Sequence, residues 1–188
     1  MEKTVEQVFA ESIEVKQETL KKNLPQIIKA AETIISALKS GHKLFFCGNG
    51  GSAADSQHIA AEFVGRFQKE RKAWPAIALT TDTSALTALG NDYTFDVVFS
   101  RQLQALGQKG DVLIAISTSG NSKNVLEAVR QAKTMGIITI AVTGGKGGQL
   151  AGQCDISIIA ASSKTARIQE SHLVIFHSIC ELVENTLA

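Results

Sequence analysis

Short apolar segments alternate with helical patterns along most of this 188-residue chain, and no other feature constrains its fold as strongly. Five segments have the length and nearly continuous apolar character of buried strands: 43–48, 76–80, 111–117, 137–143 and 155–160. Strands of this kind belong to parallel sheets, which helices cover on both faces. We therefore expect an α/β fold, a three-layer α/β/α sandwich with a parallel five-stranded sheet.

The segments between the strands carry helical patterns. Residues 3–22 place apolar side chains on one side of a helix, and Pro25 suits the first turn of a second helix over 25–39. Later helices are expected at 52–67, 83–91, 94–106 and 122–135, with a short helix before the last strand and a long C-terminal helix at 165–187. No Pro-, Gly- or Ser-rich linker divides the chain, so we expect one domain over residues 1–188, with residues 1–40 as an N-terminal helical segment.

Charge and cysteine content argue against several functional classes. Lys and Arg number 19 and Asp and Glu 18, which gives a formal net charge of +1 without a basic tract and disfavours general nucleic-acid binding. The three cysteines form no CxxC pair, so they indicate neither a disulfide framework nor a zinc knuckle. No apolar segment is long enough for a bilayer span or a signal peptide, so we expect a cytoplasmic protein without a membrane partner.

Ligands of open parallel sheets bind beyond the carboxyl ends of the strands, which directs attention to the turns after Cys47, Ile116 and Thr143. The first of these turns, GNGGSAA at 48–54, matches the loose G-x-G-x-x-A pattern of dinucleotide-binding proteins. That pattern also requires an acidic residue at the next strand, roughly 20 residues on. Here the chain has a polar loop, 66–73, before its next strand begins, so a dinucleotide site is the weaker interpretation.

The second turn, STSGNS at 117–122, carries four hydroxyl groups and one glycine. It joins a buried strand to the start of a helix, where unpaired backbone N–H groups and the helix dipole favour an anion. One or two of these side chains would suffice as helix caps. Four hydroxyl groups at this edge of the sheet favour a phosphate-binding turn over simple capping.

Two helices carry further candidates. His58 and Glu62 are spaced i, i+4 and so share one helix face, although a solvated surface pair has the same spacing. Gln169 and His177 share a side of the C-terminal helix but lie roughly 12 Å apart along its axis, so a joint role requires another surface between them. The alternatives are a helix cap for Gln169 and a satisfied core histidine for His177, and His172 looks like a surface residue.

Five blocks of the sequence resemble the sugar isomerase (SIS) domain family, and within it the phosphoheptose isomerases. They are CGNGGSAADSQHIAAEFVGRF at 47–67, LTTDTSALTALGNDY at 79–93, ISTSGNSKNV at 116–125, TGGKGG at 143–148 and ARIQESHLVIFH at 166–177. The resemblance covers essentially the whole chain. It implies an SIS-type, flavodoxin-like fold and an isomerase that interconverts D-sedoheptulose 7-phosphate and D-glycero-D-manno-heptose 7-phosphate, an early step toward the heptose of the lipopolysaccharide core.

The resemblance also implies roles for particular residues. The phosphate would be held by Ser117, Thr118, Ser119 and Ser122. The sugar would contact Asn49, Gly50, Gly51, Ser52, Glu62, Asn91, Asp92 and Gln169. Glu62 and His177 would be the catalytic pair, and the positions that bind zinc in similar enzymes are matched by His58, Glu62, Gln169 and His177. One zinc ion per subunit is therefore expected.

The resemblance further implies a homotetramer whose sites lie at subunit interfaces, with residues 1–40 used in oligomer packing. We therefore expect a partner subunit to bring Glu62 and His177 together. Ala166 stands where some family members have an acidic residue, and the neighbouring Arg167 either contacts the ligand or braces the C-terminal helix.

The chemistry of aldose–ketose isomerisation agrees with a carboxylate and an imidazole as catalytic groups. The reaction moves a proton between adjacent carbons through an enediol, and it needs one base at the carbon and one acid at the oxygens. Burial and neighbouring groups can bring the pKa values of both side chains toward neutrality. We expect Glu62 to carry the carbon-bound proton and His177 to serve the oxygens. The competing interpretation is a non-catalytic SIS adaptor that binds the replication initiator protein, and the presence of both residues favours the isomerase.

Overall fold

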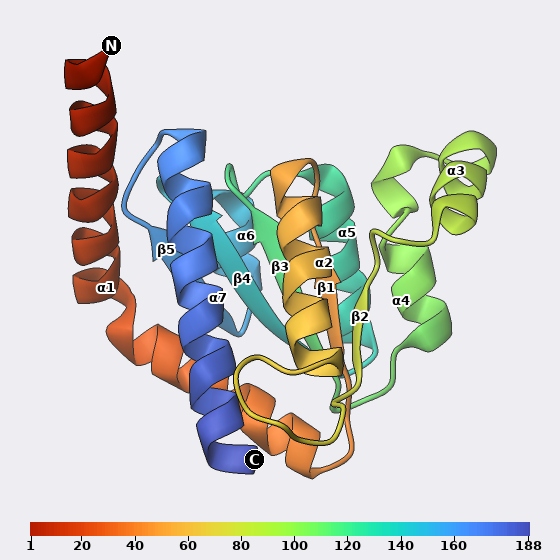
Figure 1. The fold of residues 1–188 in the computed structure, drawn as a ribbon. Coiled ribbons are helices and arrows are strands. Elements are labelled where there is room, and N and C mark those ends of the chain that lie inside the picture. The colour runs from red at the N-terminus through yellow and green to blue at the C-terminus, as the bar shows by residue number, and fades with distance from the viewer.

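The computed structural model describes residues 1–188, which form one five-stranded sheet with helices on both faces (Figure 1). All strand pairs are parallel, and the strand order is β2-β1-β3-β4-β5. The strands are β1 (Leu44–Cys47), β2 (Ala76–Ala78), β3 (Val112–Ser117), β4 (Ile138–Gly144) and β5 (Ile156–Ala160). Each strand overlaps its predicted segment, and the order is that of flavodoxin-like folds, so the expected α/β/α sandwich is confirmed.

Helices form the two outer layers. They are α1 (Glu2–Lys39), α2 (Gly51–Val64), α3 (Thr83–Asp92), the 3-10 helix η1 (Phe95–Val97), α4 (Ser100–Leu106), α5 (Lys123–Thr134), α6 (Gly148–Gln153) and α7 (Thr165–Leu187). Apolar side chains of α1, α2 and α7 pack on one face of the sheet, and those of α4, α5 and α6 pack on the other. None of the helices combines the length and apolar character needed to span a lipid bilayer.

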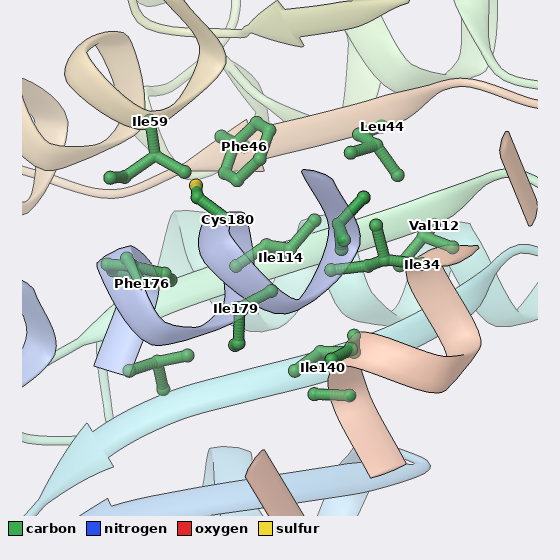
Figure 2. Close-up of a cluster of buried hydrophobic side chains, with 14 of the residues drawn as sticks. Ile34, Leu44, Phe46, Ile59, Val112, Ile114, Ile140, Phe176, Ile179 and Cys180 are labelled. Atoms are coloured by element: carbon green, nitrogen blue, oxygen red, sulfur yellow. The ribbon is translucent and has the colours of Figure 1, made fainter. Parts of the chain in front are cut away.

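Alternate residues of each strand enter two separate cores. Along β3, for example, Ile114 belongs to the core beneath α1, α2 and α7, whereas Leu113 belongs to the core beneath α4, α5 and α6. Figure 2 shows the first core, in which Ile34 of α1, Ile59 of α2 and Ile179 of α7 surround side chains of the strands. Burial on both faces explains why the strands are almost continuously apolar in the sequence.

The expectation of two N-terminal helices is wrong. Residues Glu2–Lys39 form a single helix, α1, with Pro25 inside it. An internal proline removes one backbone hydrogen bond and bends a helix axis, but it does not have to end the helix when the surrounding turns are packed. Figure 1 shows that α1 changes direction in its middle, so that its second half runs beneath the sheet layer while its first half stands beside α7.

Ionic contacts join the first half of α1 to the start of α7. Ser12 donates a hydrogen bond to Glu170 (2.6 Å), and Glu11 pairs with Lys164 and with Arg167 (3.5 Å). Arg167 also forms a two-pronged contact with Glu170. Of the two roles expected for Arg167, these contacts support bracing of the C-terminal helix.

His172 is buried rather than exposed, contrary to the expectation from sequence. Its Nε2 lies 2.9 Å from the carbonyl oxygen of Thr143, which ties the first half of α7 to strand β4. Burial lowers the pKa of His172 to about 4, so the ring is neutral at pH 7.

Two polar side chains of α1 pair with the free edge of strand β5. Asn23 Nδ2 donates to the carbonyl oxygen of Ile159 (2.9 Å), and Asn23 Oδ1 accepts from the N–H of the same residue (2.9 Å). Thr19 Oγ1 accepts from the N–H of Ala161 (2.9 Å). Because both side chains are buried, they satisfy backbone groups that an edge strand would otherwise leave unpaired.

Replacement of Asn23 by leucine is expected to lower the free energy of unfolding by about 2–4 kcal/mol, because the N–H and C=O of Ile159 lose their partner. Urea denaturation followed by circular dichroism measures the change. The control is Thr33→Ala, which removes an exposed hydrogen bond to Lys29 in the same helix and should cost at most about 0.5 kcal/mol. Equal stability of the two variants would show that the edge contact contributes little.

Candidate active site

Three turns meet at the carboxyl edge of the sheet. Strand β1 is paired with β3 so that Cys47 lies opposite Ala115, and β4 is paired with β3 so that Thr143 lies opposite Ser117. The chain therefore leaves all three strands at the same edge. Helices α2, α5 and α7 each begin there, so the positive ends of their dipoles converge on this region.

The hydroxyl turn, residues 117–122, brings its serines together. Ser117 Oγ lies 3.0 Å from Ser122 Oγ and 3.5 Å from Ser119 Oγ. Ser122 occupies the N-cap position of α5, yet its side chain makes no capping hydrogen bond. Capping therefore does not explain the hydroxyl groups, which instead form a cluster at the start of a helix, where an anion is favoured.

Glycines allow the hydroxyl turn to pack closely against the turn that follows β4. Gly120 has φ +66°, and a Cβ on it would lie 2.0 Å from the carbonyl oxygen of Gly147. In return, a Cβ on Gly148 would lie 2.5 Å from the carbonyl oxygen of Ser119. The N–H of Leu150 also donates to the carbonyl of Gly120 (2.9 Å). The two backbones approach so closely that only glycine fits at these positions.

A pair of amides joins the first turn to the start of α5. Asn49 Nδ2 donates to Asn124 Oδ1 (2.8 Å), and Asn124 Nδ2 donates to Asn49 Oδ1 (2.9 Å). Asn124 is buried, and its Oδ1 also accepts from the N–H of Val125 (3.0 Å). The sequence analysis missed Asn124, although its position two residues after the hydroxyl turn was the signal that it belongs to the site.

Helices α2 and α7 lie side by side and run in the same direction (Figure 1). Gly51 at the start of α2 faces Gln169, because a Cβ on Gly51 would lie 2.2 Å from Gln169 Nε2. Farther along, the rings of His58 and His177 meet edge to face, with centroids 5.3 Å apart. Helix α2 is therefore the surface between Gln169 and His177 that a joint role of these two residues requires.

His58 contacts both residues of the expected catalytic pair. Its Nε2 lies 3.1 Å from Glu62 Oε1, and its ring packs against His177. The Glu62 side chain is 22% exposed, compared with 44% for His58. Burial and the nearby charge of Glu62 raise the pKa of the Cys180 thiol to about 12.

These contacts correct one expectation. A partner subunit is not needed to bring Glu62 near His177, because α2 and α7 are neighbours within one chain. The distance between the two residues in sequence concealed this arrangement, since nothing local to either helix indicates that the other packs beside it.

The same face of α2 carries an acidic residue that sequence reasoning also missed. Asp55 lies one turn from Gly51 and from His58, and its Oδ2 is buried without a hydrogen-bond partner. Burial raises the pKa of Asp55, although the nearby His58 opposes this effect. The helical spacing of residues 51, 55, 58 and 62 was the available signal.

The residues expected to bind zinc do not form a ready metal site. No group of three or more His, Cys, Asp or Glu side chains is arranged to hold a metal ion. Imidazole and carboxylate groups are donors that zinc prefers. However, Gln169 lies beside Gly51, two helical turns from His58, so binding by all four residues would require side chains to move.

Asn91 and Asp92 lie apart from the other expected site residues. They occupy the exposed C-terminal end of α3, and the amide of Asn91 donates to the carboxylate of Asp92 (2.9 Å). In Figure 1, α3 stands at the far side of the domain from α7. Their contact with a sugar therefore stays a prediction.

Comparison with known proteins identifies related chains. The family model described as the SIS domain matches residues 7–144. The phosphoheptose isomerase of Campylobacter concisus is 58% identical over 155 residues, which are 82% of each chain. The phosphoheptose isomerase of Clostridium acetobutylicum is 50% identical and is aligned with 100% of this chain and 96% of its own.

A solved structure shares the whole fold. The phosphoheptose isomerase of Neisseria gonorrhoeae superposes with a TM-score of 0.93 at 48% sequence identity, and the match covers 98% of both chains. Because the coverage is nearly complete, the similarity extends to the terminal helices α1 and α7 as well as to the sheet.

Replacement of Gly120 by alanine is expected to weaken the binding of inorganic phosphate about tenfold or more, because the left-handed backbone and the contact with Gly147 both disfavour a Cβ. Isothermal titration calorimetry measures the affinity. The control is Gly152→Ala, since a Cβ there meets nothing within 4 Å, and this variant should bind as the wild type does. Unchanged affinity in a folded Gly120→Ala protein would contradict the assignment of the hydroxyl turn.

Proposed function

Because this chain belongs to the SIS domain family and is an isomerase, we propose that it interconverts D-sedoheptulose 7-phosphate and D-glycero-D-manno-heptose 7-phosphate. One observation carries the proposal: within a single chain His58 contacts both Glu62 and His177, on helices that begin at the same edge of the sheet as the hydroxyl turn. We place the reaction in the cytoplasm, in the heptose pathway toward the lipopolysaccharide core.

The hydroxyl turn is the proposed anchor for the phosphate. Ser117, Thr118, Ser119 and Ser122 offer hydroxyl donors at the start of α5, where the helix dipole favours negative charge. The sugar would then extend toward the first turn, where Asn49, Gly50, Gly51, Ser52 and Gln169 lie. Binding at a fixed phosphate would orient the reactive carbons without using the catalytic groups.

Glu62 and His177 are the proposed acid–base pair. Glu62 removes the proton from one carbon and returns it to the adjacent carbon, and His177 exchanges protons with the two oxygens. His58 Nε2 lies 3.1 Å from Glu62 Oε1, so the imidazole is placed to hold the carboxylate in one orientation. Glu62 then transfers only carbon-bound protons and His177 only oxygen-bound protons, and an enediol intermediate requires both kinds of transfer.

The proposed ligands of a zinc ion are His58, Glu62, Gln169 and His177, whose side chains would have to move to reach it. When bound, it would supply Lewis-acid character near the sugar oxygens or order the site. We expect zinc to raise the melting temperature of the wild-type protein and to have a smaller effect on His58→Ala. An equal shift in both proteins would overturn this ligand set.

A homotetramer is proposed because α1 exposes an apolar stripe that includes Val5, Phe9 and Ile13. On α7, Val174 and Leu182 are also exposed. Packing of residues 1–40 against other copies would bury this surface, and an interface would give Asn91 and Asp92 access to a sugar. Sedimentation velocity tests the assembly, and a monomer at micromolar concentration would contradict it.

Replacement of Glu62 by glutamine is expected to lower kcat about 100-fold or more, because the amide cannot accept the carbon-bound proton. The conversion of sedoheptulose 7-phosphate, followed by NMR, measures turnover. The matched control is Glu181→Gln on the exposed face of α7, which should retain wild-type kcat.

Two outcomes would count against these assignments. Near-normal turnover by folded Glu62→Gln would remove Glu62 from the mechanism. Absence of product from folded wild-type protein, with and without added zinc, would overturn the proposed substrate and favour the adaptor that binds the replication initiator.

A further inference from the structure

A buried ion pair lies at the end of α2 that is farther from the hydroxyl turn. The side chains of Arg71 and Glu184 are only 4% and 2% exposed, and Arg71 Nε donates to Glu184 Oε1 (3.2 Å). Glu184 belongs to α7, whereas Arg71 belongs to the loop between α2 and β2. We call this pair the Arg71–Glu184 clamp. It has no role in the acid–base scheme described above.

Arg71 caps the C-terminal end of α2 by donating hydrogen bonds to carbonyl groups there. Its Nη2 donates to the carbonyl oxygen of Glu62 (2.7 Å), and its Nη1 donates to those of Phe63 (2.9 Å) and Gly65 (3.0 Å). Carbonyl groups in the last turn of a helix have no partner within the helix, and a cation there also complements the dipole. Arg71 thus holds the backbone of the residue whose side chain is the proposed base.

Glu184 fixes the loop on the other side of the clamp. Its carboxylate accepts from the N–H groups of Phe67 (3.1 Å), Gln68 (2.8 Å) and Lys69 (2.8 Å). Burial acts to raise the pKa of Glu184, but these donors and Arg71 lower it overall, so the group is ionised at neutral pH. The position of Phe67 that results places its ring against that of His177, with centroids 5.6 Å apart.

The clamp is therefore linked to both halves of the proposed catalytic pair, directly to Glu62 and through Phe67 to His177. One branch runs from Arg71 to the backbone of Glu62, and the other runs from Glu184 through Phe67 to the ring of His177. A buried ion pair is a costly way to stabilise a fold, because apolar side chains of similar volume often do as well. Its directional hydrogen bonds instead specify the geometry of the groups that they join.

We propose that Arg71 and Glu184 are positioning residues, which set the placement of Glu62 relative to His177 by tying the end of α2 to α7. This inference rests on the proposed function, since it assigns the clamp to the same acid–base pair. Phosphate binding should not depend on it, because the hydroxyl turn lies at the opposite end of α2.

The test compares Arg71→Lys with a matched control. Lysine keeps the charge but cannot reproduce the five hydrogen bonds that the guanidinium makes to Glu184, Glu62, Phe63, Gly65 and Lys72. The control, Lys43→Met, breaks another ion pair, with the buried Asp111 (2.9 Å), where strands β1 and β3 begin. Phe67→Leu is a second variant, which leaves the ion pair intact and removes only the ring on His177.

We expect Arg71→Lys to lose about tenfold or more in kcat, with KM and the affinity for inorganic phosphate within about twofold of wild type, because misplacement of reacting groups acts on turnover. Phe67→Leu should show the same pattern to a smaller degree. Lys43→Met should lose thermal stability but keep wild-type kcat. All assays are run well below the melting temperature of each variant, which circular dichroism determines.

The possible failures are distinguishable. Wild-type kcat in both Arg71→Lys and Phe67→Leu would overturn the positioning role, and so would an equal loss in Lys43→Met. If Arg71→Lys does not fold, Phe67→Leu decides the question alone. A wild-type protein without isomerase activity would instead refute the proposed function and this inference with it.

Discussion

Parallel pairing of the five strands determines where polar groups can gather in this protein. Both faces of the sheet are covered by helices, so a strand can present polar groups only at its ends. At the carboxyl edge the chain turns into α2, α5 and α7, and the beginnings of three helices thereby lie together. The hydroxyl turn, the amide pair of Asn49 and Asn124, and the contact between Gly51 and Gln169 all result from this one arrangement.

Helix α2 is held at both of its ends, which is a requirement for precise acid–base geometry. Its first residue, Gly51, lies against α7, since a Cβ there would be 2.2 Å from Gln169 Nε2. At its end, the Arg71 guanidinium donates to two of its last carbonyl groups and to that of the next residue, Gly65. His58 and Glu62 lie between these two fixed points, and α7 provides His177 across the same interface.

Periodic apolar segments and the hydroxyl turn made the sheet, the helix order and the edge at which polar side chains gather predictable from sequence. Pro25 led to the wrong prediction of two helices. A proline usually begins or interrupts a helix, but here packing against the rest of the chain keeps α1 continuous through Pro25. His172 and the Arg71–Glu184 clamp were beyond prediction for another reason: charged and polar residues are read as exposed, and burial of Arg71 depends on a partner 113 positions away. The same limit applied to the proximity of α2 and α7, which no local pattern encodes.

The serines and threonine of the hydroxyl turn have a consequence for how the molecule responds to acidity. Hydroxyl groups of this type stay neutral throughout the range in which proteins fold. An anion bound by these hydroxyl groups therefore has no positively charged side chain within the turn that could lose its charge as the pH changes. Between mildly acidic and neutral solution the turn therefore keeps its charge, whereas a phosphate ester gains or loses a proton near pH 6, about the midpoint of its second ionisation.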